Sequence, residues 1–323
     1  MKKGINIIKV WLGILGGMLC LSGCAGETSA GAGGEMVESL SRGEAMLLVA
    51  TERNRYEQLY TDQIWNVTMP EEGNSFGDFL LQQVKQFAGD IKVVDQMAGE
   101  YGIELDSSEN EQLRRLSEDY YSQLSQADLE YTGATQEDAF QLYQDYHLAC
   151  KTVDQLTRAS DLEISDSQAQ VIEIRQIVLE DEAEASQVLS LVQEEGADFA
   201  SIAQEYSTED EISLEIGRGE TDAAIETAAF SLEEGEISPI ISAGGKYYLI
   251  QCVNPYDQEA TRERKEEMTL LKKDEAFRKI YDEFLEAHPL VTDDQVWTGI
   301  SCETDLDTTT VNFFSLYEEY FPE

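Results

Sequence analysis

The sequence predicts an α+β protein in which helical regions stand before and after a smaller region that contains strands. Apolar residues recur every three or four positions before about residue 162 and again over residues 258–287, which is the spacing of amphipathic helices. Between these regions, Val171–Leu179 and Tyr247–Val253 are short apolar runs of the kind that form strands. A Gly-Gly pair at 244–245 separates two β-like runs and is typical of a hairpin. A chain of 323 residues is long enough for two or three domains.

The chain is strongly acidic, and this excludes several classes of partner. It has 65 Asp and Glu against 22 Lys and Arg, which gives a formal net charge of −43 at pH 7. Such a chain repels phosphate backbones and anionic membrane surfaces, so nucleic-acid binding and a polybasic lipid-binding role are excluded. Acid clusters such as Glu209–Glu211 lack the ordered oxygen spacing of a calcium loop and indicate solvated surface. The sequence predicts no cofactor and no metal site.

The N-terminus has the pattern of an export signal. Lys2, Lys3 and Lys9 precede an apolar run, Val10–Leu19, that is too short for a confident membrane span. The run ends in Leu21–Cys24, Leu-Ser-Gly-Cys, which resembles a bacterial lipobox. We therefore predict a lipoprotein signal peptide over residues 1–23, lipidation of Cys24, a flexible tether over 24–35, and a lipid-anchored location on the extracytoplasmic face of a bacterial cell membrane. The alternative is an ordinary secretory signal with a chance cysteine.

Four helices are predicted between residues 36 and 164. The clearest runs over about Ser75–Tyr101, and Gly102 can end it. A later helix starts at Thr135, where Asp138 completes a capping box. We interpret the apolar stripes as core faces. The stripes of the other two helices are Met46, Val49, Tyr56, Leu59 and Tyr60, and Leu113, Leu116, Tyr120 and Leu124.

A long helix is predicted again over about Gln258–Ala287, and Pro289 stops it. The following tail, residues 289–323, is rich in aromatic residues, so we expect it to dock on the folded protein rather than to form a ligand site. The sequence does not indicate where it docks. The predicted apolar face of the helix is Met268, Leu271, Phe277, Ile280, Tyr281 and Phe284.

Cysteines and histidines limit the possible chemistry. Cys150 and Cys252 stand in apolar contexts that indicate buried free thiols, and these two with Cys302 cannot all pair within one chain. The only histidines, His147 and His288, lie outside the strand-containing region. A mechanism that needs imidazole is excluded there unless one of them reaches in from another domain.

A series of short motifs in the second half of the chain resembles the parvulin family of peptidyl-prolyl isomerases. The motifs occur in the family's order and spacing, and they are Val171–Leu179, Ala197–Ser207, Ile216–Glu220, Ala228–Phe230, Gly235–Ser242 and Tyr247–Val253. This resemblance implies a parvulin-like domain over residues 165–255, with a four-stranded antiparallel sheet and surrounding helices.

The region before it resembles the chaperone region of SurA- and PrsA-type foldases. The segments that match are Phe79–Val84, Ala98–Asp106, Thr135–Asp138 and Leu162–Asp166. This resemblance implies a helical domain over residues 36–164, completed by a helix over 256–288 that returns to it. It also implies unfolded or partly folded secreted polypeptides as partners.

The polar groups of a parvulin site are exchanged in this sequence. Gln176 and Tyr248 stand at the positions of the family's two histidines, and Glu209 follows Tyr206-Ser207 near the position of its Cys or Asp. Strand alternation predicts that Gln176 and Tyr248 share a face and are close enough to form a hydrogen-bonded couple. The resemblance implies a peptide pocket at Ile216, Thr221, Ile225 and Phe230.

Three functions follow from these observations. The exchanged site favours a foldase or chaperone whose isomerase activity is weak or lost. A working prolyl isomerase with a rebuilt site is the first alternative. A structural lipoprotein of the cell envelope, without client binding, is the second.

Overall fold

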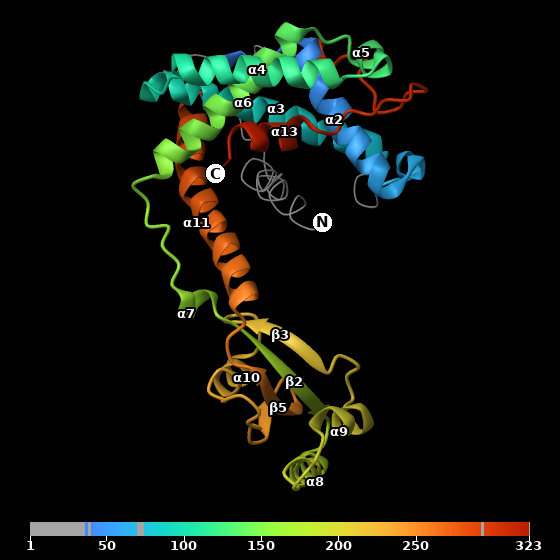
Figure 1. Cartoon of the computed structure of the whole chain (residues 1–323), viewed down its shortest axis with the longest axis vertical. Helices are drawn as coiled ribbons and strands as arrows, with labels where there is room; N and C mark the ends of the chain where they lie inside the picture. The colour runs from blue at the N-terminus through green and yellow to red at the C-terminus, as the bar shows by residue number, and fades with distance from the viewer. Residues whose placement is uncertain (1–35, 38–39, 70–73, 292–293, 323) are drawn as a thin grey trace. The chain divides into compact units, whose positions relative to one another are not determined.

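The computed structural model describes residues 36–37, 40–69, 74–291 and 294–322 (Figure 1). The predicted signal peptide, Cys24 and the tether lie outside the described residues. The chain divides into two compact units, which we call unit 1 (up to Ser160 and from Lys273 onward) and unit 2 (Asp161–Lys272). The predicted α+β class is confirmed, because unit 1 is built of helices and unit 2 contains a four-stranded antiparallel sheet. The domain boundaries drawn from the sequence stay predictions.

In unit 1 the helix α6 packs against both α3 and α4, and α13 packs against α4 (Figure 1). The structure adds a two-residue parallel pair, β1 (Met36–Val37) with β6 (Leu290–Val291), which is too short to leave a strand pattern in the sequence. The helices of this unit are α2 (Arg42–Tyr60), η2 (Asp62–Asn66, a 3₁₀ turn), α3 (Phe76–Tyr101), α4 (Ser107–Gln123), α5 (Gln126–Thr132), α6 (Gln136–Thr157), α12 (Asp294–Trp297) and α13 (Phe313–Tyr320).

Capping residues set the starts of these helices as the sequence predicts. Ser75 caps α3, and Gly102 ends it in a left-handed conformation with φ of 65°. Thr135 caps α6 and forms a reciprocal box with Asp138. The carboxylate of Asp138 also accepts a hydrogen bond from the hydroxyl of Ser41, the N-cap of α2. One acidic side chain therefore fixes the starts of two helices that are distant in the sequence.

The core of unit 1 is rich in aromatic residues and includes the C-terminal tail. Tyr120, Tyr143, Tyr281 and Phe313 are among the largest fully buried side chains. The predicted docking of the tail is thus confirmed, and the structure supplies its position.

Two parts of the predicted core faces are wrong. Leu59 and Tyr60 are 64% and 58% exposed, because the buried residues of α2 cluster before Arg55 and its last turn extends past the core. In α11 (Gln258–Ala287) the apolar face is interrupted at Leu271, which is 58% exposed. Phe277 and Tyr281 are buried in unit 1, whereas the part of α11 that belongs to unit 2 makes mainly polar contacts.

Unit 2 is a twisted sheet with helices on both faces. Its strand order is β3-β2-β5-β4, and Gly244 and Gly245 form the predicted hairpin between the last two strands. Strands β2 and β5 are central, and α8 and α9 cover one face while α10 packs near the other. The elements are α7 (Asp166–Ala169), β2 (Val171–Leu179), α8 (Glu182–Val192), α9 (Phe199–Tyr206), β3 (Ser213–Gly217), α10 (Ala223–Ala229), β4 (Ile241–Ala243) and β5 (Lys246–Asn254).

Unit 1 also buries a carboxyl group, that of Asp90 on α3. The side chain is 0% exposed, its Oδ1 accepts hydrogen bonds from Tyr281 Oη (2.7 Å) and Gln86 Nε2 (2.8 Å), and its Oδ2 has no partner among the described residues. Burial raises the pKa of Asp90 to about 7, against the two hydrogen bonds, which lower it. The folded state therefore binds this proton more tightly than the unfolded chain does.

We expect Asp90→Asn to stabilise the protein at pH 8 and to have little effect near pH 4. The folded pKa of about 7 is above the ordinary value of 3.8, so the wild-type protein loses stability as pH rises between these values. The neutral amide avoids that loss, which is on the order of 2–4 kcal/mol at pH 8. Urea unfolding from pH 4 to 8 measures the difference. Glu118→Gln, an exposed change on α4, is the control, and an equal response of both variants would contradict the assignment.

Candidate functional site

The register of the central strands places Gln176 and Tyr248 on one face of the sheet. Gln176 pairs with Ile250, and Tyr248 pairs with Val178, in the antiparallel ladder of β2 with β5. Directly opposed residues share a face, so Gln176 and Tyr248 are diagonal neighbours, roughly 7–8 Å apart at their Cβ atoms by the usual geometry of such pairs. The predicted common face is confirmed.

The predicted hydrogen bond between these two side chains is wrong. The amide Nε2 of Gln176 donates to the main-chain carbonyl of Glu211 at 3.0 Å, and its main-chain N–H donates to Ile212 O at 2.8 Å. The loop after α9 runs along β2 here, since Thr208 N also donates to Val178 O at 2.8 Å. The short loop thus offers Gln176 a nearer acceptor than Tyr248, and the amide is used to hold the loop.

Glu209 lies in the same loop and is also engaged. Its carboxylate pairs with the ammonium group of Lys246, the first residue of β5, two positions before Tyr248. This pair raises the pKa of Lys246, first through the hydrogen bond and then through charge. The side chains are half-exposed, so the pair contributes little to stability.

The other predicted residues surround a partly exposed apolar patch on the same side of the sheet. Ile216 is buried in the cluster under this face, and Ile225 and Phe230 pack against it partly buried. The hydroxyl of Thr221 is buried and has no hydrogen-bond partner among the described residues. The guanidinium of Arg218 lies over the ring of Phe230, 4.2 Å from its centroid.

An arginine that the sequence reasoning missed holds the turn beside this patch. Arg264, on α11, donates to Arg218 O (2.5 Å), Gln168 O (3.0 Å) and the Glu220 carboxylate (2.9 Å). A Cβ atom at Gly217 would be 2.5 Å from the Arg264 guanidinium. Gly217 is therefore needed for this close approach of Arg264 to the turn. In the sequence, the Gly-Arg-Gly turn at 217–219 was the signal that could have indicated it.

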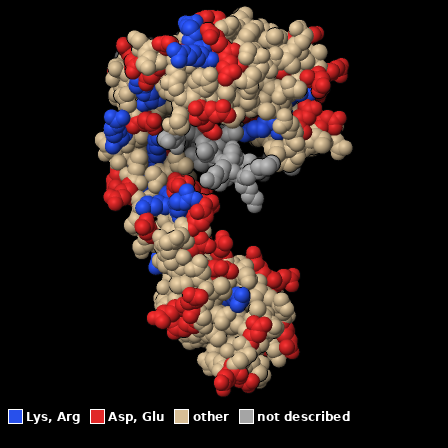
Figure 2. Space-filling model, viewed as in Figure 1, with Lys and Arg blue, Asp and Glu red and all other residues tan. Residues whose placement is uncertain are grey.

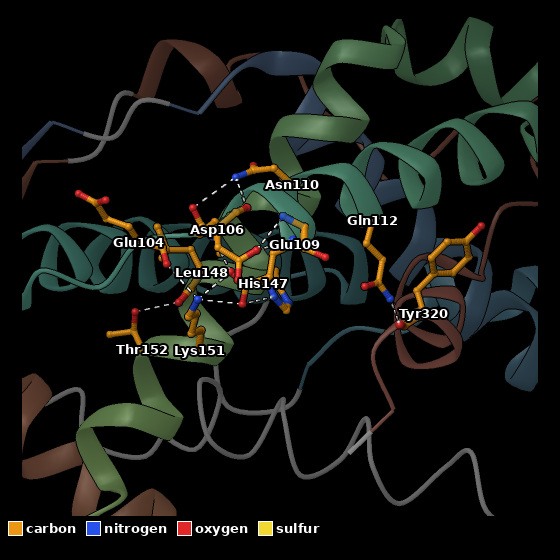
Figure 3. A network of polar contacts seen from close by, with 12 residues as sticks. Glu104, Asp106, Glu109, Asn110, Gln112, His147, Leu148, Lys151, Thr152 and Tyr320 are labelled. Carbon is orange, nitrogen blue, oxygen red and sulfur yellow. Dashed lines mark hydrogen bonds and ion pairs between the residues drawn. The ribbon is translucent and has the colours of Figure 1, made fainter.

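The two histidines serve other purposes. His147 Nδ1 is 2.7 Å from the hydroxyl of Tyr317, and its Nε2 is 3.6 Å from the carboxylate of Glu109, within the polar network of Figure 3. Burial lowers the pKa of His147, although Glu109 opposes this. His288 Nε2 pairs with Glu100 at 3.0 Å. Both rings are thus engaged by residues of unit 1, and residues 161–272 contain no histidine.

Comparison with known proteins decides the identity of unit 2. Residues 167–259 match the family model described as the PPIC-type PPIase domain. This segment is a parvulin-type domain. The candidate site residues Gln176, Glu209 and Tyr248 all lie within it.

The comparisons also identify relatives of a larger part of the chain. A foldase protein PrsA of Streptococcus pneumoniae (strain Hungary19A-6) is 29% identical over 177 residues, which cover 47% of this chain and 54% of that protein. The chain thus spans about half the length of the curated relatives it matches. A crystal structure of PrsA from S. pneumoniae str. Canada MDR_19A is 23% identical, with 67% and 87% of the two chains covered and a TM-score of 0.28. The crystal structure of PrsA from Bacillus cereus is 18% identical, with 79% of this chain and 97% of that chain covered and a TM-score of 0.35.

The polar residues of this candidate site differ in how far the protein itself engages them. A parvulin site twists an X-Pro amide without any covalent step, which requires polar groups that face the bound peptide. In this domain, the amide of Gln176 and the carboxylate of Glu209 are already bound to the protein. Tyr248 has no hydrogen-bond partner among the described residues and is the one free polar group of the three.

We expect Gln176→Glu to loosen the loop after α9. The substitution replaces the donor to Glu211 O by a carboxylate, which repels that carbonyl and costs about 1 kcal/mol. Amide exchange over residues 208–212, measured by mass spectrometry, should accelerate about fivefold. Gln204→Glu, an exposed change of equal charge on α9, should leave it unchanged. Equal protection in both variants would show that the Gln176 bond does not hold the loop.

Proposed function

We propose that this protein is an extracytoplasmic, lipid-anchored foldase that binds unfolded or partly folded secreted polypeptides, and that its parvulin-type domain has weak or no isomerase activity. The observation that carries the second part is the pair Gln176 and Tyr248 at the family's histidine positions, in a unit that contains no histidine. The similarity to PrsA foldases supports the first part.

The loss of catalysis follows from the demands of the reaction. Rotation about a peptide bond has a barrier of roughly 18–20 kcal/mol, and an enzyme lowers it with groups that interact more strongly with the twisted amide than with the planar one. A glutamine that donates to Glu211 O and a glutamate paired with Lys246 are not available for this purpose. The remaining apolar patch still suits a peptide, and we assign peptide contact to Ile216, Thr221, Ile225 and Phe230.

The surface charge fits a protein that keeps other chains soluble. Acidic side chains are spread over the visible face with few basic ones among them (Figure 2). The high net negative charge opposes self-association, attracts basic unfolded chains and repels acidic ones. This supports unfolded polypeptides, and not nucleic acid, as the partners.

The proposed location depends on the N-terminal segment. Three lysines, an apolar run and the sequence Leu-Ser-Gly-Cys24 support a lipid anchor at Cys24. Among the described residues, no helix has the length and apolar character to cross a membrane. Residues 24–35, rich in Gly and Ala, would separate the anchor from the folded part.

The main test measures both activities on the chain from residue 25 onward. We expect it to suppress aggregation of a refolding secreted protein at equimolar concentration. We expect it to accelerate cis-trans exchange of an X-Pro peptide, followed by NMR, by about twofold or less. A larger acceleration that Gln176→Ala or Tyr248→Phe abolishes would establish a working isomerase with a rebuilt site. If neither activity appears, the structural alternative is favoured.

The anchor has its own test. In a bacterial host that processes lipoproteins, the full chain should fractionate with membranes and incorporate labelled fatty acid. Cys24→Ala should abolish the label and release the protein, because a single chemical linkage holds it. Cys150→Ala, a change at a buried thiol, should leave both unaltered. Membrane retention of the Cys24→Ala protein would contradict the anchor.

A further inference from the structure

The tail is bound to unit 1 through its main chain as well as through its side chains, and the main-chain contacts lie close together. Asp128 Oδ1 accepts hydrogen bonds from the N–H groups of Thr309 (2.8 Å) and Thr310 (3.1 Å). Asn54 Nδ2 donates to Thr310 O at 2.9 Å, and Tyr143 Oη donates to Phe313 O at 2.9 Å. Four successive contacts thus join side chains on α2, α5 and α6 to peptide groups of the tail.

This pattern differs from that of an ordinary core segment. About two-thirds of protein hydrogen bonds join main chain to main chain. Between residues 304 and 311, the described structure has one such bond, from Thr308 N to Leu306 O. Side chains that bind peptide groups hold an extended chain whatever its sequence, which is how peptide-binding proteins obtain affinity.

Tail side chains add further contacts, which include threonine hydroxyl groups and aromatic rings. Phe313 is fully buried, its ring stacks on Tyr143 with centroids 4.2 Å apart, and its edge meets Tyr120 at 5.6 Å. One turn later, the hydroxyl of Tyr317 is 2.7 Å from His147 Nδ1. Such buried aromatic anchors beside a hydrogen-bonded chain are typical of binding hot spots.

We propose that this surface, formed by Asn54, Tyr120, Asp128, Tyr143 and His147, is a polypeptide-binding site. Residues 304–322 occupy it as a tethered ligand, and an unfolded segment with neighbouring aromatic residues displaces them. The proposal rests on the proposed foldase function and names the site of unit 1 at which clients bind.

The tail is suited to be a displaceable occupant. Residues 304–323 contain five acidic residues and no basic one, on a chain whose net charge is −43, so overall repulsion opposes its binding. A neutral or basic client segment avoids this repulsion. The tether compensates, because it gives the tail an effective concentration on the order of millimolar. Cutting the tether should therefore favour a client in solution.

The experiment cuts the chain between Glu303 and Thr304. The hydrogen bonds on either side, Glu303 N to Ser301 Oγ and Leu306 N to Thr304 Oγ1, are local, so an inserted protease site spares the contacts with the helices. The protein folds intact and is then cleaved. A fluorescent synthetic peptide of residues 304–323 is added to the cleaved and the uncleaved protein, and binding is measured by anisotropy. A reduced, alkylated and permanently unfolded protein serves as competitor.

We expect saturable binding of the peptide to the cleaved protein, at least about tenfold weaker binding to the uncleaved protein, and displacement by the unfolded competitor. An ester in place of the Thr310 amide removes the N–H bound by Asp128, and it should weaken binding about tenfold. The matched control is an ester at the exposed residue Asp307, whose N–H has no partner among the described residues, and it should bind like the parent peptide.

Three results would overturn the proposal. The first is that the cleaved tail does not exchange with the peptide. The second is that circular dichroism shows the helical unit unfolding when the tail leaves. The third is that the unfolded protein fails to displace the peptide. In each case the tail is a fixed part of the core. Suppression of aggregation together with any of these results would leave the foldase function standing. Displacement without suppression of aggregation would instead refute the foldase function.

Discussion

The stacking of Phe313 on Tyr143 is the interaction on which the position of the C-terminal tail on unit 1 depends. The two rings lie 170 residues apart in the chain and are both fully buried, with Tyr120 and Tyr146 meeting Phe313 at its edges. An aromatic pair of this kind contributes about 0.5–1.5 kcal/mol beyond the area it buries. Its larger consequence is geometric, because it fixes the tail against α4 and α6. The main-chain contacts of Asp128 and Asn54 are made by Thr309 and Thr310, a few residues before this ring.

In unit 2, the sheet and its apolar core are formed separately from the hydrogen bonds and ion pairs of the polar side chains. The ladder of β2 with β5 and the apolar cluster of Ile172, Ile174 and Ile250, against which Tyr248 packs, build the sheet. The polar side chains of Gln176 and Glu209 make local contacts instead. Gln176 illustrates the result, since its amide has become part of the loop's support. A parvulin-type frame alone does not establish isomerase activity.

The sequence predicted those features that depend on neighbouring residues. The cap at Thr135, the hairpin at Gly244-Gly245 and the shared face of Gln176 and Tyr248 follow from local pattern and strand alternation, and the structure confirms them. The partner of Gln176 was mispredicted, because it depends on the path of the loop after α9. That path is set by its main-chain bonds to β2 and not by any periodicity.

Asp128 shows why the place of the tail could not be predicted. In the sequence, Ser125-Gln-Ala-Asp128 is a capping box, and the structure contains it, with Oδ2 accepting from Ser125. The same carboxylate binds Thr309 and Thr310, which are 181 and 182 residues further along the chain. Their N–H groups donate to Oδ1, and the hydroxyl of Thr309 donates to Oδ2. A carboxylate has lone pairs for both tasks, and a local motif reveals one of them. The capping box accounts for Asp128 in the sequence, so nothing in the sequence indicates that its carboxylate also binds the tail. A buried acid that already has a function in the sequence pattern can still bind a second, distant partner.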